Sequence, residues 1–362
     1  MIHIIIGTKA QYIKTAPLLR ELDSRNIAYN FIDTGQHAQI TKDLRQELSI
    51  REPNVYLRKE KDISAISDAF IWLVKYIMLA TFSPKRISRD IFNNKKGICV
   101  IHGDTLSTLL SLYLAKRVGL KVAHIEAGLR SYNIFNPFPE EIVRIIAMKY
   151  SDILFSPSDW AYDNLISMNL KAKLINLKMN TNIESTRFAL TCKSNLSLEI
   201  KNYCLITIHR AETIFNEKRM RFIVNLLLRI AKFRNLIFIM HKPTILSLKR
   251  YRLYNALNNS KNIELLRLLT HTDFINLLNN ADFIITDGGS IQEESFYLGI
   301  PCLLMRKNTE RIEGLDSNVY LSRFNQERID YFISDYQKFR TNKFSNQNSP
   351  SEIIFQEIIK YA

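Results

Sequence analysis

Several carboxylates follow apolar segments of this sequence, and clustered carboxylates are suited to moving protons. Asp104 lies in the segment HGDT, Glu126 in HIEAGLR, and Glu140 in PFPEEIVR. Carboxylates that lie close together shift one another's pKa values, so that one can act as an acid and another as a base. We therefore predict that Asp104, Glu126 and Glu140 converge at one edge of a sheet.

The same carboxylates also have a purely structural interpretation. Asp104 and either Glu140 or Glu141 would then cap helices, and Glu126 would pair with Arg130. The sequence leaves both interpretations open.

A glycine-rich segment, DGGSIQEE, follows an apolar stretch and opens a helical pattern. Gly288 and Gly289 would let a ligand approach the backbone closely, and the N–H groups at a helix start attract phosphate. Glu294, one helical turn later, could accept hydrogen bonds from ribose hydroxyls. An ordinary βα turn explains the segment equally well, because it matches neither GxGxxG nor a phosphate-binding P-loop.

The segment IHRAE places His209 and Arg210 at the end of another apolar stretch. An isolated histidine is usually structural, but an arginine beside it at a strand end is expected of a group that faces phosphate. The histidines are dispersed and no CxxC or HxxxH spacing occurs, so we predict no metal site.

Short β-branched segments alternate with stretches of helical periodicity, which is typical of a parallel sheet covered by helices on both faces. The alternation is interrupted over residues 170–201 and then restarts. The predicted fold class is therefore α/β, with two doubly wound Rossmann-like domains that face each other across a cleft. We expect an N-terminal domain over residues 1–170, a C-terminal domain over residues 171–345, and a terminal helix over residues 346–362 that packs back on the N-terminal domain.

Composition excludes several classes of protein. The formal net charge is +15, but the basic residues are scattered and no zinc finger or RNA-binding signature occurs, so we expect no nucleic-acid partner. No apolar stretch reaches the length of a membrane span, and the start MIHIIIGT lacks the features of a signal peptide. We expect a cytoplasmic protein without membrane insertion, and we expect its four cysteines to be core thiols.

Taken in order, the segments GTKAQYIKTAPL, HGDT, HIEAGLR, PFPEE, IHR and DGGSIQEES resemble the non-hydrolysing UDP-N-acetylglucosamine 2-epimerase family. The resemblance continues to NTERIE, near residue 312, and so covers most of the chain. It implies a GT-B-like fold, a homodimer, and no cofactor. The implied reaction converts UDP-GlcNAc into UDP-ManNAc by elimination and re-addition of UDP, for surface polysaccharide precursors.

The resemblance also assigns roles to residues. It implies that Asp104, Glu126, Glu140 and His209 are catalytic, without showing which carboxylate removes the proton. The residues implied to bind the UDP-sugar are Lys9, Lys14, Arg130, Arg210, Gly288, Gly289, Ser290 and Glu294. The family also binds a second UDP-GlcNAc as an activator through a QHxQ segment, and the matching residues here are Gln36, His37 and Gln39, with His241 at a further position.

The chain departs from the family pattern on the nucleotide side. The first loop reads GTKAQ where the family has GTRPE, DGGS replaces DSGG, and Glu184 stands where an aspartate is usual. Lys9 keeps a positive charge in the first loop but lacks the planar guanidinium that binds phosphate through two bonds. These changes favour a different sugar nucleotide or a lower activity.

Four alternative functions stay open. The chain could epimerise a modified UDP-HexNAc, release the free sugar as a hydrolysing 2-epimerase, act as a GT-B glycosyltransferase, or bind nucleotide sugars without catalysis. The EAGLR and PFPEE forms favour the non-hydrolysing branch, and the carboxylates with His209 argue against a non-catalytic protein.

Overall fold

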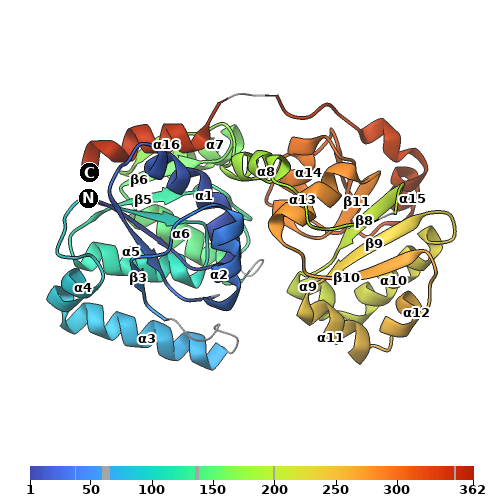
Figure 1. The fold of residues 1–362 in the computed structure, drawn as a ribbon, viewed down its shortest axis with the longest axis horizontal. Helices are drawn as coiled ribbons and strands as arrows, with labels where there is room; N and C mark the ends of the chain where they lie inside the picture. Colours follow the sequence, from blue (N-terminus) through green and yellow to red (C-terminus); the bar gives the residue numbers. More distant parts are fainter. Residues whose placement is uncertain (37, 59–65, 135–137, 199, 346–347) are drawn as a thin grey trace. The chain divides into compact units, whose positions relative to one another are not determined.

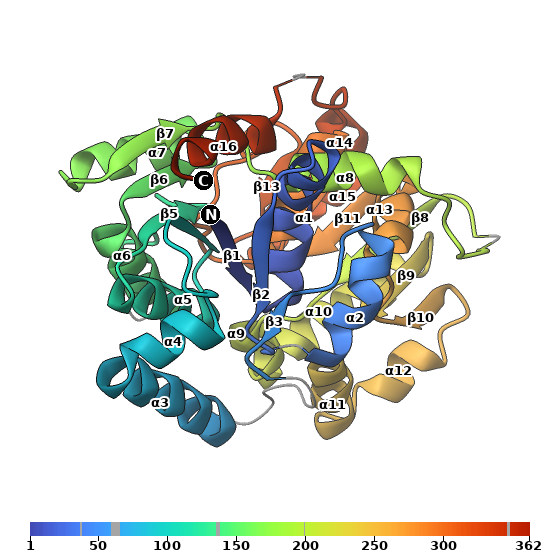
Figure 2. The same ribbon diagram turned by 60° about the vertical axis from the view of Figure 1, so that its left-hand side comes forward.

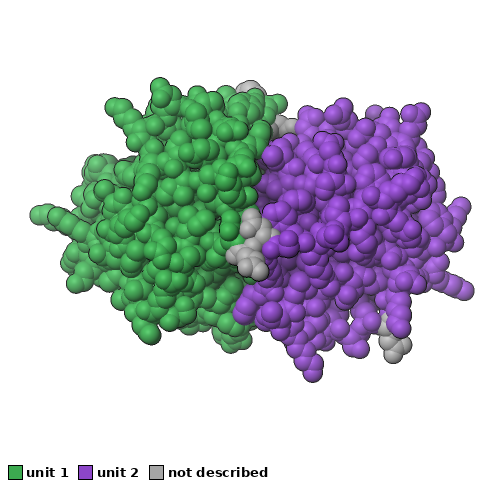
Figure 3. Space-filling view, turned by 90° about the horizontal axis from the view of Figure 1, so that it is seen from above, with its two compact units in different colours: residues 1–185, 348–362 green, residues 186–347 purple. Residues whose placement is uncertain are grey.

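The structure is a computed structural model, and it describes all residues except 37, 59–65, 135–137, 199 and 346–347. For residues 38–40, 66–67 and 69–70 it describes only the backbone. The chain forms two compact units, which Figure 3 colours separately. Unit 1 contains Met1–Ser185 and Asn348–Ala362, and unit 2 contains Thr186–Gln347.

Unit 1 is built on a parallel sheet with the strand order β3-β2-β1-β4-β5-β6-β7. Its strands are β1 (Ile2–Ile6), β2 (Tyr29–Asp33), β3 (Val55–Tyr56), β4 (Ile98–His102), β5 (Lys121–Ile125), β6 (Ile153–Ser156) and β7 (Lys173–Asn176). Its helices are α1 (Lys9–Ser24), α2 (Ala38–Glu47), α3 (Ile66–Phe82), α4 (Pro84–Asp90), α5 (Leu106–Arg117), α6 (Glu140–Tyr150), α7 (Asp159–Ser167), the first residues of α8 (Asn182–Thr191), and α16 (Pro350–Ile358), which a short 3₁₀ helix, η2 (Ile359–Tyr361), follows.

The helices of unit 1 cover both faces of its sheet. Successive side chains of a strand point to opposite faces, so Ile4 of β1 packs in a core with α1 and α16, while Ile5 packs in a second core with α3 and α5. Figures 1 and 2 show α3 and α4 on one side of the sheet and α1 and α16 on the other. The apolar strands of this sheet are buried on both faces, as their continuous hydrophobic sequences indicate.

Unit 2 repeats the same design with the strand order β10-β9-β8-β11-β12-β13, again with parallel pairings. Its strands are β8 (Tyr203–Thr207), β9 (Asn235–Met240), β10 (Ile263–Arg267), β11 (Phe283–Thr286), β12 (Cys302–Leu304) and β13 (Val319–Leu321). Its helices are α9 (Ala211–Ile214), α10 (Glu217–Ile230), α11 (Lys242–Arg250), α12 (Tyr254–Asn258), α13 (His271–Asn280), α14 (Gly289–Leu298), α15 (Gln326–Asp335) and the 3₁₀ helix η1 (Tyr336–Phe339).

The prediction of two doubly wound Rossmann-like domains is confirmed, but the boundary at residue 170 is displaced. The interval 170–201, which we expected to be irregular, contains β7 and α8. Strand β7 pairs with β6 at the edge of the first sheet, so the first unit extends to Ser185. Its sequence KLIN is short and only partly buried, which is why it carries a weak strand pattern.

The terminal helix α16 belongs to unit 1, where Ile354, Phe355 and Ile358 join the core that α1 also lines. Arg25 pairs with Glu352 between these two helices. The predicted core cysteines are confirmed for Cys99, Cys204 and Cys302, which are buried within strands, whereas Cys192 is partly exposed. No helix in the described part of the chain combines the length and apolar character needed to cross a bilayer.

Candidate functional site

In each unit the predicted site residues gather where the strand order reverses. In an open parallel sheet, the chain leaves the two strands at this point toward opposite faces of the sheet, which leaves room for a ligand outside their carboxyl ends. In unit 1 the reversal lies between β1 and β4, and in unit 2 it lies between β8 and β11.

Glu126 follows β5 and lies at the centre of a buried polar cluster in unit 1. Its Oε1 accepts hydrogen bonds from Nζ of Lys14 at 2.5 Å and from Nδ2 of Asn180 at 2.8 Å, and its Oε2 lies 3.7 Å from Nδ1 of His102. The Glu126 backbone has a φ of +67°, a left-handed conformation that is uncommon for residues other than glycine and often marks functional positions. Lys14, which we predicted to bind nucleotide, is therefore placed against a carboxylate that we predicted to be catalytic.

Asp104 follows β4, the strand next to β5, and is paired with an arginine of α6. Its Oδ2 accepts from Nη2 of Arg144 at 2.6 Å and from Nε at 2.8 Å. A guanidinium stays charged under all ordinary conditions, so Arg144 places a fixed positive charge against Asp104. Asp104 and Glu126 thus lie on neighbouring strand ends, each with its own cation.

The alternative pairing of Glu126 with Arg130 is wrong. Nε of Arg130 instead donates to Oε1 of Glu141 at 2.6 Å, and the backbone N–H of Ser131 donates to Oε2 at 2.9 Å. Burial raises the pKa of Glu141, but these hydrogen bonds outweigh it and leave the pKa below its usual value. Arg130 and Glu141 therefore shape the loop that follows β5.

Glu140 differs sharply from its neighbour. It is the first residue of α6, one helical turn before Arg144, and its Oε2 is buried without a hydrogen-bond partner among the described residues. Glu141 forms ion pairs with Arg130 and Arg144, whereas no ion pair of Glu140 occurs among the described residues. Glu140 is thus available for a ligand, as expected of a catalytic group.

The unusual glutamine of the first loop, GTKAQ, has a structural role. Oε1 of Gln11 accepts from the backbone N–H groups of Gly7 and Thr8, and its Nε2 donates to the carbonyl of His102 at 2.7 Å. This completes a capping box with Thr8 at the start of α1. Gln11 therefore joins the ends of β1 and β4, and Lys9 is the first residue of the helix that it caps.

In unit 2 the central residue is Asp287, which follows β11 and is fully buried. Its Oδ1 accepts from the backbone N–H of His209 and its Oδ2 from that of Arg210, both at 3.0 Å. Nδ1 of His209 lies 3.5 Å from Oδ1 of Asp287. Burial lowers the pKa of His209, although the Asp287 charge opposes this shift, so the imidazole is neutral near pH 7.

The start of α14 forms a place for an anion. Gly288 is its N-cap, and Gly289, Ser290 and the buried Glu294 lie in its first two turns. A Cβ on Gly289 would lie 3.1 Å from Nε of Arg311, so this arginine runs across the helix start. Backbone N–H groups and a guanidinium at one helix terminus are the usual means of binding phosphate.

The carboxylate of Glu310 lies against two further arginines of this region, Arg306 and Arg210. Oε2 of Glu310 accepts from Arg306 at 2.5 Å, and Oε1 lies 3.9 Å from Nη1 of Arg210. The positive charge of Arg311 is in turn balanced by the buried Glu293 at 3.3 Å. These pairs hold the arginine side chains in place.

We predict that Gly288→Ala damages the histidine site without unfolding unit 2. The φ of Gly288 is −85°, so alanine strains no backbone, but its Cβ would lie 2.7 Å from Cε1 of His209. The imidazole must move, and we expect UDP affinity to fall about tenfold, as for the loss of one good polar contact. Calorimetric titration with UDP measures this, with Asp335→Ala, which removes a surface pair with Lys338, as the control. Unchanged affinity would contradict the described packing.

The predicted activator residues are divided between the two units. Gln36 accepts from Oγ of Ser107 at 2.6 Å in unit 1. His241 caps α11 in unit 2 and stacks on His209, with 4.8 Å between ring centroids. His37 and the side chain of Gln39 lie outside the described residues. The activator site therefore stays a prediction.

Sequence reasoning missed several groups that complete the two sets. They are His102, Arg144 and Asn180 in unit 1, and Arg306, Glu310 and Arg311 in unit 2. The run RKNTER directly after β12 offered a signal, because cations after a parallel strand lie at the ligand-binding edge. Asn180 carried no such signal.

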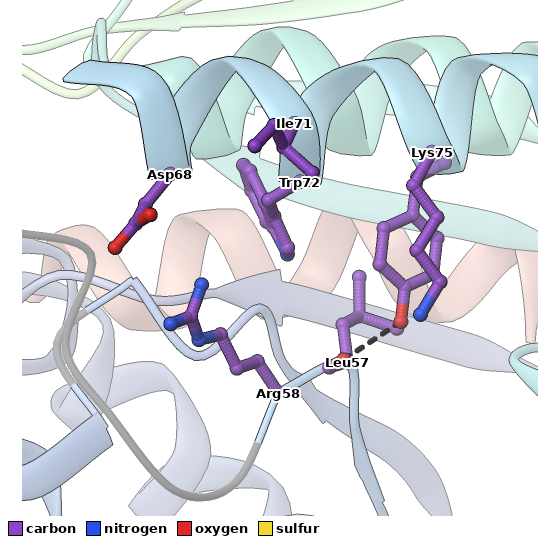
Figure 4. A pocket seen from close by; sticks show the side chains of 7 residues that line it. Leu57, Arg58, Asp68, Ile71, Trp72 and Lys75 are labelled. Carbon is purple, nitrogen blue, oxygen red and sulfur yellow. Dashed lines mark hydrogen bonds between the residues drawn. The ribbon is translucent and has the colours of Figure 1, made fainter. Parts of the chain in front are cut away.

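A cavity of about 280 Å³ lies elsewhere in unit 1, between α3 and the segment after β3 (Figure 4). None of the predicted site residues lines it. Its lining residues are Leu57, Arg58, Asp68, Ile71, Trp72, Lys75 and Tyr76. Within the described ranges, no group of three His, Cys, Asp or Glu side chains is placed to hold a metal ion.

Comparisons with known proteins identify one family. The family model described as UDP-N-acetylglucosamine 2-epimerase matches residues 20–352. A UDP-N-acetylglucosamine 2-epimerase homolog of Methanococcus maripaludis is 32% identical and aligns with 97% of each chain. A UDP-2,3-diacetamido-2,3-dideoxy-D-glucuronate 2-epimerase of Pseudomonas aeruginosa is 30% identical and aligns with 85% of this chain and 84% of its own.

Solved structures agree with this. The crystal structure of the Methanocaldococcus jannaschii UDP-GlcNAc 2-epimerase in complex with UDP-GlcNAc and UDP matches with a TM-score of 0.82 and 29% identity. The match covers 100% of this chain and 99% of that one. It confirms the predicted GT-B-like fold class.

Proposed function

The chain belongs to the UDP-N-acetylglucosamine 2-epimerase family, and we propose that it inverts C2 of a UDP-N-acetylhexosamine without hydrolysing it. The observation that carries this proposal is the acidic set of unit 1. Asp104 and Glu126 are each held by a cation on adjacent strand ends, while Glu140 presents a buried oxygen without a described partner. A glycosyltransferase does not move the C2 proton of its donor sugar, so it does not need these three carboxylates.

The proposed reaction proceeds by elimination and re-addition. A carboxylate removes the C2 proton, the C1–O bond to UDP breaks with its electron pair leaving on UDP, and a 2-acetamidoglucal forms. UDP then adds back to C1 while an acid returns a proton to the other face of C2. Proton transfer of this kind requires a base and an acid held in different protonation states. The lysine-paired Glu126 suits the base and Glu140 suits the acid.

Unit 2 would hold the leaving group between the two steps. The start of α14, Arg311 and Arg210 supply hydrogen bonds and positive charge to a diphosphate. The neutral His209 beside them can donate a hydrogen bond to a phosphate oxygen as negative charge develops there. Neither step, as proposed, requires a cofactor.

UDP-GlcNAc is the first candidate substrate because the family model and most of the named relatives carry that name. A second candidate follows from the Pseudomonas aeruginosa relative, whose named substrate is a diacetamido uronate. The altered first loop of this chain is compatible with either nucleotide sugar. A role in surface polysaccharide synthesis, a homodimeric state and a cytoplasmic location remain predictions.

Solvent-exchange NMR tests the proposal. We expect that incubation with UDP-GlcNAc in deuterated water produces UDP-ManNAc with deuterium at C2. The diacetamido uronate substrate is assayed in parallel, which separates the two candidates. Free ManNAc would show hydrolysis instead, and no C2 exchange with either UDP-sugar would overturn the epimerase proposal.

A further inference from the structure

Two described side chains hold one carboxylate oxygen of Glu126. Lys14 and Asn180 both donate to Oε1, whereas Oε2 faces His102. Lys14 is 4% exposed and Asn180 is 1% exposed, so water competes little for either bond. The carboxylate is thus fixed in rotation, because both donors bind the same oxygen.

Asn180 has its amide orientation set by contacts of its own. Its Oδ1 accepts from the backbone N–H of Asn182 at 3.4 Å and from Oγ1 of Thr181 at 3.3 Å. These contacts form a turn in which an asparagine side chain replaces a backbone carbonyl, and the turn begins α8. Because the amide oxygen serves the turn, the NH₂ group is left to point at Glu126.

We infer that Asn180 is a positioning residue, which holds the Glu126 carboxylate in the orientation in which it takes the C2 proton. This inference rests on the proposed function. A neutral amide donor favours the anionic, accepting form of Oε1, and it fixes the plane of the carboxylate. Nothing in the amide itself reacts, so its effect reaches the substrate only through Glu126.

The decisive variant is Asn180→Asp. Aspartate accepts the Asn182 N–H as well as asparagine does, so the turn before α8 is kept. It removes the donor to Oε1 and places a second carboxylate against Glu126, whose other charged or titratable neighbours, Lys14 of α1 and His102 of β4, are unchanged. We expect kcat for C2 deuterium exchange to fall roughly 100-fold with KM nearly constant, as for a weakened general base.

The pH profile separates positioning from a structural role. Two adjacent carboxylates each raise the pKa of the other. The pH below which kcat falls should therefore be at least about one pH unit higher in Asn180→Asp than in the wild type. Asn180→Ser, which keeps the turn but cannot reach Oε1, should lose less activity and show no repulsive shift of that size. Asn325→Asp, at the N-cap of α15, is the matched control and should match the wild type.

Two outcomes would overturn the inference. One is a folded Asn180→Asp or Asn180→Ser enzyme with wild-type kcat and an unshifted acidic limb. The other is a loss confined to thermal stability, with normal kcat in the folded fraction. If the wild type itself exchanges no C2 proton with any UDP-HexNAc tested, the proposed function fails and the inference fails with it; an active wild type with insensitive variants refutes the inference alone.

Discussion

Glu126→Gln should abolish almost all C2 proton exchange while leaving the protein folded. The amide oxygen of glutamine can still accept from Lys14 and Asn180, so the cluster keeps most of its hydrogen bonds. The variant lacks a basic oxygen, and removal of a general base costs about 10²–10⁴ in rate. We therefore expect a fall of about 1,000-fold in the rate of deuterium incorporation from solvent, followed by NMR.

Binding and stability serve as the controls for this variant. UDP affinity, measured by calorimetry, should stay within about threefold of the wild type, because the proposed phosphate-binding groups lie in unit 2. Glu21→Gln, which alters a surface pair with Arg25, should retain full activity. A Glu126→Gln enzyme that exchanges the C2 proton within about tenfold of the wild-type rate would exclude Glu126 as the base.

Asp287→Ala should destabilise unit 2 and weaken nucleotide binding together. The buried carboxylate accepts the backbone N–H groups of His209 and Arg210, and alanine leaves both without that acceptor. Each lost hydrogen bond to a charged group costs about 1.5–3 kcal/mol. A combined loss of about 3 kcal/mol would lower the melting temperature by roughly 6–12 °C for a unit of this size.

Nucleotide binding reports the second effect of Asp287→Ala. The loop that presents His209 and Arg210 loses its anchor, so we expect UDP affinity to fall at least about tenfold. Asp287→Asn keeps one acceptor oxygen and should lie between the wild type and the alanine variant in both measurements. Asp335→Ala, which removes a surface pair with Lys338, is the control. A melting temperature within about 2 °C of the wild type would contradict the anchoring role of Asp287.

Local pattern in the sequence was sufficient for the architecture. Continuous apolar strands alternating with helices predicted two parallel sheets, since a strand buried on both faces must be apolar throughout. The same pattern located Asp104, Glu126, His209 and the DGGS turn at strand ends, because parallel strands bring their carboxyl ends to one edge. The boundary was misplaced because β7 is a partly buried edge strand with little apolar content.

Partners of the site residues were decided only by the tertiary structure. Glu126 pairs with Lys14 and Asn180, which are distant in sequence, and not with the nearby Arg130. The distinction between Glu140 and Glu141 depends on where Arg130, from the loop after β5, meets α6. Residue type and strand-end position are local properties that a sequence carries, whereas the choice of partner depends on how separate elements pack, and so the partners of the acidic residues were decided only in the folded chain.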